Sequence, residues 1–336
     1  MIIKPLILTL TLAAASVTAQ AADSIQLGNY RVTGTYALDL AAGSVSGLEA
    51  SAVTYARDRG TLFFAGDEGT GIFEISLSGQ TLGRMAFDWS GTGSTKHDTE
   101  GLTYLGNGVL VSTEERLQDA YRFTFVNGGS AVLKDSFVSI GPDSVGNNGI
   151  EGISYDARQG GRFITVKQQL PQNILAGSLS FGPATGNPPS LAGDGSSPPG
   201  GGVSTMSTLF DPAVLALSTL SDVQTLSSVD ALIGTPGADN LLLLSLGSRL
   251  LVEVNRQGQL LSFFDLSHVL PNNGIEGVTV DELGNIYLVA EQDQTGSAPT
   301  GARSQLIVLS VVPEPSSYGL MALGLGALGW LRLRRR

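Results

Sequence analysis

A short phrase built around an acidic residue recurs along this chain of 336 residues. In its fullest form it reads Glu-Gly, an aliphatic residue, Thr or Ser, and Tyr, as at Glu100 and Glu151. The acidic residues of the five copies, of which the fourth is the weakest, are Glu49, Glu100, Glu151, Asp222 and Glu276. Their intervals are 51, 51, 71 and 54 residues. Carboxylates repeated in this way are candidate ligands for a hard cation such as calcium.

Further acidic residues stand after the apolar run that follows most of these phrases. They are Asp67 and Glu68, Glu114 and Glu115, and Glu291 and Asp293. Lys167 and Ser245 take the corresponding place in the third and fourth copies. Carboxylates crowded together raise one another's pKa unless a cation or Lys167 compensates. We therefore expect calcium to be bound by a set drawn from both groups: Glu49, Glu100, Glu151, Asp222, Glu276, Glu114 and Glu291. The alternative is structural, with the Glu-Gly pairs capping backbone amides at the start of a strand.

The segments between the acidic phrases have the pattern of short strands. Each phrase opens an alternating strand, a turn follows, and an apolar strand comes next, as at residues 109–111. Fourth strands are expected at residues 82–87, 131–140 and 259–266. Units of about 50 residues with four strands and no helical periodicity predict an all-β fold, a five-bladed β-propeller. A six-bladed propeller, with a degenerate blade in the long third interval, is the alternative.

The last unit has only three strands before the chain's tail. A spare strand at residues 30–40 can supply its fourth strand and close the ring, which removes the exposed sheet edges. In a propeller the first strand of each blade lies nearest the central channel, and all first strands run in the same direction. The acidic residues that open them should therefore meet at one mouth of the channel.

The long third interval contains an insertion. Residues 181–205 are rich in Gly, Pro and Ser and show no strand pattern, so we expect a mobile loop near the third and fourth blades.

The two ends of the chain carry targeting signals. Lys4, an apolar run and Ala19-Gln20-Ala21 predict a signal peptide over residues 1–21 that signal peptidase removes. The propeller then covers residues 22–312. At the C-terminus, Pro313-Glu314-Pro315 precedes a short apolar run and four arginines, an order that resembles the PEP-CTERM sorting signal of Gram-negative bacteria. The resemblance implies transient membrane anchoring over residues 313–336, recognition by an exosortase, and release to the cell surface or surrounding matrix.

Composition and charge exclude several classes of function. Without its two ends the chain has 14 basic and 29 acidic residues, so nucleic acid is excluded as a partner. The chain has no cysteine, which excludes disulfides, thiolate metal sites and a cysteine nucleophile. A calcium-dependent hydrolase of the phytase or esterase type is an alternative function. His97 and His268 are then the candidate bases, and Lys167, Lys96 and Arg116 the candidate phosphate ligands. A structural matrix component is a third alternative.

The acidic phrases resemble those of the SdiA-regulated family of bacterial β-propeller proteins. The similarity extends from about Gly47 to Leu309 and is strongest around Glu100, Glu151 and Glu276. It implies a five-bladed propeller with a bound calcium and a central pore that takes a ligand or a protein, without an established enzymatic activity. The insertion at 181–205 and the missing Glu-Gly in the fourth copy depart from the family pattern.

Overall fold

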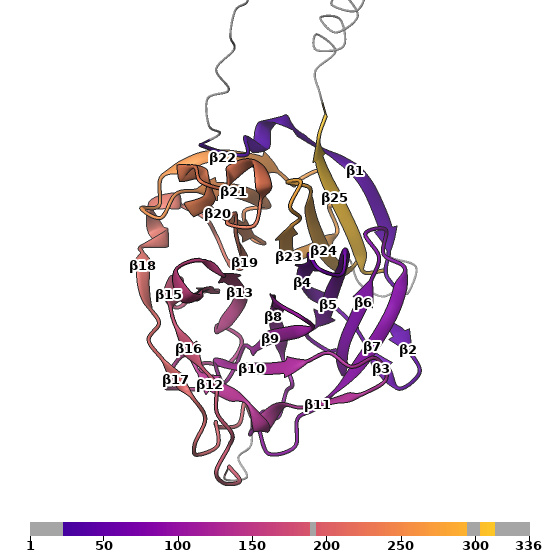
Figure 1. The fold of residues 1–336 in the computed structure, drawn as a ribbon, viewed down its shortest axis with the longest axis vertical. Helices are drawn as coiled ribbons and strands as arrows, with labels where there is room; N and C mark the ends of the chain where they lie inside the picture. Colours follow the sequence, from indigo (N-terminus) through magenta and orange to yellow (C-terminus); the bar gives the residue numbers. More distant parts are fainter. Residues whose placement is uncertain (1–22, 189–192, 294–302, 313–336) are drawn as a thin grey trace, which may run out of the picture.

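The computed structural model describes residues 23–188, 193–293 and 303–312. Within them, five sheets of four or five strands are arranged around a central axis (Figure 1). The predicted signal peptide (1–21) and the predicted sorting signal (313–336) lie outside the described residues. No helix in the described part of the chain is long and apolar enough to cross a membrane.

Each sheet is one blade, and its strands follow one another outward from the axis. Blade 1 contains β4 (Ala50–Ala56), β5 (Thr61–Gly66), β6 (Gly71–Ile75) and β7 (Thr81–Asp88). Blade 2 contains β8 (Thr99–Gly106), β9 (Val109–Glu114), β10 (Asp119–Thr124) and β12 (Phe137–Ser139). Blade 3 contains β13 (Ile150–Asp156), β14 (Arg162–Lys167), β15 (Asn173–Gly177) and β18 (Ser207–Phe210). Blade 4 contains β19 (Leu220–Thr225), β20 (Leu241–Ser245), β21 (Leu250–Val254) and β22 (Leu260–Asp265).

Blade 5 is assembled from both ends of the described chain. It contains β23 (Asn273–Val280), β24 (Ile286–Asp293), β25 (Gln305–Val311) and, as its outer strand, β1 (Tyr30–Ala37). β1 pairs antiparallel with β25, from Tyr30 opposite Val311 to Ala37 opposite Gln305. The predicted five-bladed ring, closed by an N-terminal strand, is therefore confirmed.

The segment predicted as one fourth strand over residues 131–140 is divided between two blades. β11 (Ser130–Val132) pairs in parallel with β7 and adds a fifth strand to blade 1. The single turn η2 (Leu133–Asp135) follows, and only then does β12 join blade 2. The prediction of one strand was wrong because Leu133 turns into the apolar core between blades 1 and 2 and interrupts the extended run.

The described part of the insertion is folded against blade 2. β16 (Leu179–Ser180) pairs with β17 (Val203–Ser204), and the Phe137 amide of β12 donates to the carbonyl of Gly182 over 2.9 Å. The Ser197 hydroxyl donates to the Asp119 carboxylate at 2.9 Å. The other short elements are β2 (Ala41–Ala42), β3 (Val45–Ser46), η1 (Leu27–Asn29), η3 (Arg158–Gly160), η4 (Pro212–Leu215), η5 (Asp230–Leu232) and η6 (Pro236–Asp239).

Hydroxyl groups join the inner strands of neighbouring blades. The Thr54 hydroxyl accepts the Tyr104 amide, Thr103 accepts that of Tyr155, and both distances are 3.0 Å. In the same way Ser154 accepts the Thr225 amide and Thr279 accepts the Tyr55 amide, again at 3.0 Å. The Thr or Ser of the repeated phrase therefore satisfies a backbone donor of a neighbouring inner strand.

Candidate functional site

Every inner strand begins with a β-bulge at the same place. At this place the pairing register skips one residue of each inner strand, and the skipped residues are Ser51, Glu100, Glu151, Ser221 and Glu276. A bulge re-aims the side chain of the extra residue, and here it does so at the same mouth of the channel five times. Three carboxylates and two hydroxyls thus occupy equivalent positions. Glu49 lies two residues before its bulge and Asp222 one residue after it.

The glycine after each Glu lies where two inner strands approach closely. A Cβ atom on Gly277 would lie 2.7 Å from the Ser51 carbonyl oxygen and 3.0 Å from the Val53 nitrogen. A Cβ atom on Gly101 would meet the Ile153 nitrogen at 3.1 Å. The Glu-Gly pair therefore combines an acid on the bulge with the one residue that allows this approach.

A second set of carboxylates comes from the ends of the second strands. Gly66, Glu114 and Ala290 pair with the residue just before the bulge in blades 1, 2 and 5. The residues that follow them are Asp67, Glu115 and Glu291. Because these three occupy equivalent positions, they return to the same mouth as the bulge residues.

The two sets meet in two overlapping clusters. Carboxylate oxygens of Glu49, Asp67 and Glu291 all lie within 4.8 Å of one another, and so do those of Asp67, Asp98 and Glu100. Asp67 belongs to both clusters. Asp98, Glu100 and Glu291 are buried, and Glu49 and Asp67 are partly buried. We call these residues, with Glu115, Glu151 and Glu276, the acidic mouth.

Five carboxyls of the acidic mouth hold their protons unusually tightly. Burial, followed by the nearby charges of Glu49, Glu291 and Asp98, raises the pKa of Asp67 to about 8. Burial also raises the pKa of Glu115 to about 7. Burial also raises the pKa values of Glu100, Glu151 and Glu276, and neighbouring carboxylates raise them further. These groups cannot all ionise near neutral pH unless a positive charge joins them.

Little positive charge from the protein reaches the acidic mouth. Arg116 pairs with Asp98, its Nε lying 2.5 Å from Oδ2. In the described part of the chain Lys167 forms no ion pair, so the compensation that its place in the sequence suggested is not made. After burial, the nearby Glu115 carboxyl raises the pKa of Glu151 and the nearby Glu291 carboxyl raises that of Glu276, so each pair favours sharing one proton.

Two of the predicted ligands are used elsewhere. The Asp222 carboxylate accepts the Val278 and Val223 amides, each at 2.7 Å, and so joins blade 4 to blade 5. The Glu114 carboxylate accepts the Ser94 hydroxyl and the Leu117 amide, also at 2.7 Å, and so holds the turn after β9.

The other five predicted ligands, Glu49, Glu100, Glu151, Glu276 and Glu291, lie at the acidic mouth. The structure adds Asp67 and Glu115, which the strand-end pattern had singled out, and Asp98, which it had not. Asp98 stands two residues before Glu100 in the connection that leads into β8. No repeat marks it, because equivalent acids are missing from the other copies of the phrase.

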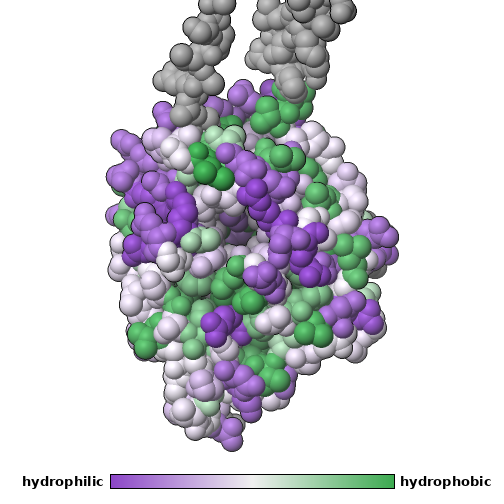
Figure 2. All heavy atoms as spheres, in the orientation of Figure 1, coloured by the Kyte–Doolittle hydropathy of each residue, from purple (hydrophilic) through white to green (hydrophobic). Residues whose placement is uncertain are grey.

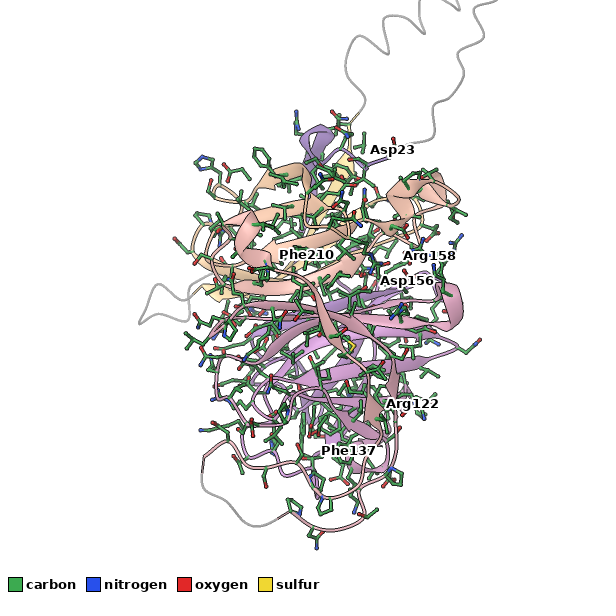
Figure 3. All side chains as sticks on the ribbon, turned by 90° about the vertical axis from the view of Figure 1, so that its left-hand side faces the viewer. Asp23, Arg122, Phe137, Asp156, Arg158 and Phe210 are labelled. Atoms are coloured by element: carbon green, nitrogen blue, oxygen red, sulfur yellow. The ribbon has the colours of Figure 1, made fainter. Side chains whose placement is uncertain are left out.

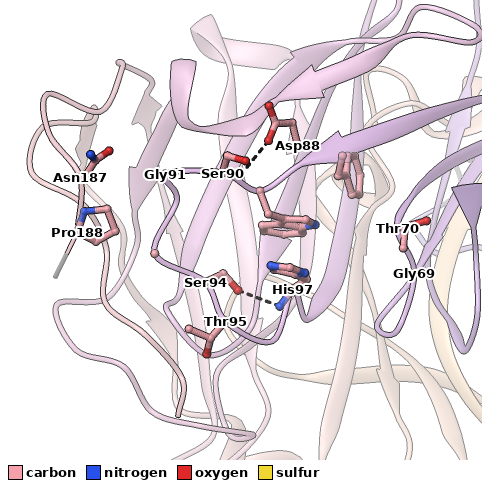
Figure 4. Close-up of a pocket in the computed structure, with 13 residues that line it drawn as sticks. Gly69, Thr70, Asp88, Ser90, Gly91, Ser94, Thr95, His97, Asn187 and Pro188 are labelled. Carbon is pink, nitrogen blue, oxygen red and sulfur yellow. Dashed lines mark hydrogen bonds between the residues drawn. The ribbon is translucent and has the colours of Figure 1, made fainter. Parts of the chain in front are cut away.

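His97 lies beside the acidic mouth in a cavity of about 710 Å³ (Figure 4). Its ring stacks on Trp89 with centroids 5.2 Å apart, and its amide donates to the Ser94 hydroxyl at 2.9 Å. Asn187 and Pro188 of the insertion line the same cavity. Burial lowers the pKa of the His97 imidazole. His268 is exposed in the segment after β22.

Several solved structures are similar to this chain at low identity. Glutaminyl cyclase from Myxococcus xanthus is 11% identical with a TM-score of 0.47, over 84% of this chain and 97% of that one. Aldose sugar dehydrogenase from Streptomyces coelicolor, bound to PQQ, gives the same four values. The calcium-binding protein regucalcin from Agrobacterium tumefaciens is 9% identical with a TM-score of 0.43, over 84% and 97% of the two chains.

Two family models match the chain itself. The PEP-CTERM protein-sorting motif matches residues 311–336, which implies processing by an exosortase and export to the cell envelope or surface of a Gram-negative bacterium. The SdiA-regulated model matches residues 28–294, from η1 to the end of β24, and so takes in all five bulges of the acidic mouth. This chain therefore belongs to the SdiA-regulated family.

Proposed function

We propose that the protein is an exported calcium-binding propeller whose acidic mouth presents the ion to a ligand or partner. The observation that carries the proposal is the place of Asp67, whose carboxylate lies within 4.8 Å of two further pairs of carboxylates. A cation between Asp67, Asp98 and Glu100 would supply the missing positive charge, and Glu49 and Glu291 could complete its shell or hold a second ion.

Calcium fits these donors better than other common metals. All the acidic groups offer oxygen, which hard cations prefer, and the clusters contain no histidine or cysteine ligand. The carboxylates come from separate blades and connections, so their arrangement is irregular. Calcium accepts six to eight oxygens in loose geometry, whereas magnesium demands a near-ideal octahedron. An ion left partly open at the mouth could then bind an oxygen atom of a partner.

The proposal is tested by two separate variants, each of which removes one negative charge at one of two adjacent positions. Asp67→Asn removes the shared ligand, whereas Glu68→Gln removes an exposed charge from the same loop. Calcium titration of the full chain should show at least tenfold weaker binding for Asp67→Asn and unchanged binding for Glu68→Gln. Equal affinity in both variants would contradict the proposed site.

We also propose that the chain is anchored only transiently. Signal peptidase would cleave after Ala21, and the exosortase would cut near Pro313-Glu314-Pro315 after the apolar segment has entered the membrane. Mass spectrometry of the protein recovered from the cell surface should detect no C-terminal peptide that contains the arginine cluster. A surface protein that still ends in Arg336 would contradict release.

A further inference from the structure

A second cavity lies at the other end of the channel, where the inner strands finish. Its volume is about 670 Å³, within the range of small-molecule sites. All five blades contribute to its lining, through Tyr55, Tyr104, Tyr155, Gln224 and Thr279. We call it the tyrosine mouth. It begins three residues beyond the bulge of blade 2, at Thr103, which is about 10 Å along a strand from Glu100.

The tyrosine mouth faces the viewer in Figures 1 and 2. Arg158, which lines it, is labelled at the right of Figure 3, the side that corresponds to the face shown in the first two views. Figure 2 shows this face hollowed at its centre, with hydrophilic residues on both sides of the opening and hydrophobic residues below it. The cavity is therefore open to a ligand from outside and separate from the acidic mouth on the opposite face.

Three equivalent tyrosines form the aromatic part of the lining. Tyr55, Tyr104 and Tyr155 each follow the Thr or Ser that joins the inner strands, and each ring is partly exposed. The Tyr104 hydroxyl accepts the Gly108 amide at 2.7 Å, and the Tyr55 ring stacks on Tyr287 with centroids 6.4 Å apart. These contacts fix the rings before any ligand arrives, so a ligand would meet a preorganised surface.

The charges that line the tyrosine mouth cancel. Two arginines, Arg57 and Arg158, stand against two acids, Asp58 and Glu282. Both arginines are also paired, Arg57 with Asp230 at 2.9 Å and Arg158 with Asp156 at 2.6 Å. The rest of the polar lining is uncharged: Thr54, Thr103, Asn107, Gln224, Ser227, Ser228 and Thr279. The four charged side chains of the lining itself therefore sum to zero.

A ligand that suits this lining is uncharged, carries many hydrogen-bonding groups, and has an apolar face to lie on an aromatic ring. Sugar rings combine these properties, because their C–H faces pack on aromatic rings while their hydroxyls bond to amides and hydroxyls. We propose that the tyrosine mouth binds a neutral saccharide. The site uses no calcium ligand, so it works independently of the acidic mouth.

The test measures binding of neutral oligosaccharides of glucose, galactose and mannose to the full chain by calorimetry. At least one should bind to the unmodified protein below about 10 mM, and Tyr104→Leu should weaken that binding at least tenfold. Tyr36→Leu, which changes an exposed tyrosine of β1 far from the cavity, is the matched control and should bind as the unmodified protein does. EDTA and Asp67→Asn should leave the affinity unchanged.

A second variant protects the test against misfolding. Asn107→Gly removes an amide from the lining, and its positive φ of 55° suits glycine, so the turn should keep its shape. It should lower the affinity at least threefold. The proposal is overturned if no neutral oligosaccharide binds at about 10 mM, or if both cavity variants bind as the control does. Binding that is lost with Asp67→Asn but kept with Tyr104→Leu would also overturn it, since the ligand would then lie at the acidic mouth.

Discussion

Asp67 is the central residue of the proposed calcium site, because it belongs to both carboxylate clusters. Its protonation depends on its burial and on the charges of the neighbouring acidic groups. Its folded pKa of about 8 lies above that of an unfolded Asp, so the folded protein binds more protons between these two values. Stability without calcium should therefore fall as pH rises from about 4 to about 8. Glu115, with a pKa of about 7, adds to the fall in the same direction.

This pH dependence yields the first prediction. In EDTA the full chain should unfold at a lower temperature at pH 8 than at pH 6, and saturating calcium should reduce the difference because it compensates the ionised carboxylates. Thermal unfolding followed by circular dichroism at both pH values measures it. Stability that stays constant or rises with pH in EDTA would show that folding does not raise the pKa of these carboxyls.

Asp222 is predicted to stabilise the fold and not to bind calcium. Replacing it by Ala leaves the buried Val278 amide without its acceptor, which should cost about 1–3 kcal/mol of unfolding free energy. Asp222→Asn keeps an acceptor and should cost less. Urea unfolding and calcium titration of both variants check this. If the variants lose calcium affinity but keep their stability, Asp222 is a calcium ligand and this prediction is wrong.

At the scale of strands, the bulge and the glycine after it determine where the acidic groups lie. Gly277→Ala places a methyl group 2.7 Å from the Ser51 carbonyl and from the Val289 side chain, so the inner strands of blades 5 and 1 must separate. Such overpacking should lower the free energy of unfolding by about 1–3 kcal/mol.

Gly28→Ala is the matched control for this change, because a Cβ atom there meets nothing within 4 Å. It should alter stability by less than about 0.5 kcal/mol. Urea unfolding of both variants makes the comparison. Equal stability would mean that the close approach of the inner strands does not require glycine.

The inner strands also show how far sequence reasoning reaches. Glu100, Glu151 and Glu276 were correctly expected at one mouth, because their closely similar phrases keep the same register. Glu49 and Asp222 were matched to them by charge, whereas the bulges place Ser51 and Ser221 in register. When copies of a repeat are weakly similar, their alignment by sequence can be wrong by one or two residues. Such a shift changes which face of the strand a side chain lies on.

Other features depended on contacts that no local pattern contains. Asp98 joins the acidic mouth from a connection outside the repeat, so only the folded arrangement brings it beside Asp67. β11 pairs with blade 1 and not with blade 2, because Leu133, which follows it, packs into the core between these blades. The five blades themselves were predictable, since each blade repeats strand patterns that hydrophobic alternation reveals.

For the molecule as a whole, the closing strand β1 joins the ends of the ring. Its Tyr30 hydroxyl donates to the Gly284 carbonyl at 2.8 Å, and the strand covers the edge of β25. A chain lacking residues 1–37 should expose that edge, lose thermal stability and associate through it. Light scattering after gel filtration checks this. A truncated chain that stays monomeric with an unchanged melting temperature would show that the ring does not depend on β1.

The measurement that tests calcium binding most directly is thermal unfolding of the full chain with calcium, with magnesium and with EDTA. A folded state that binds calcium must be stabilised in proportion to the logarithm of its concentration. The melting temperature should therefore rise with calcium, change much less with magnesium, and lose its calcium response in Asp67→Asn. Three superimposed melting curves would contradict the calcium site.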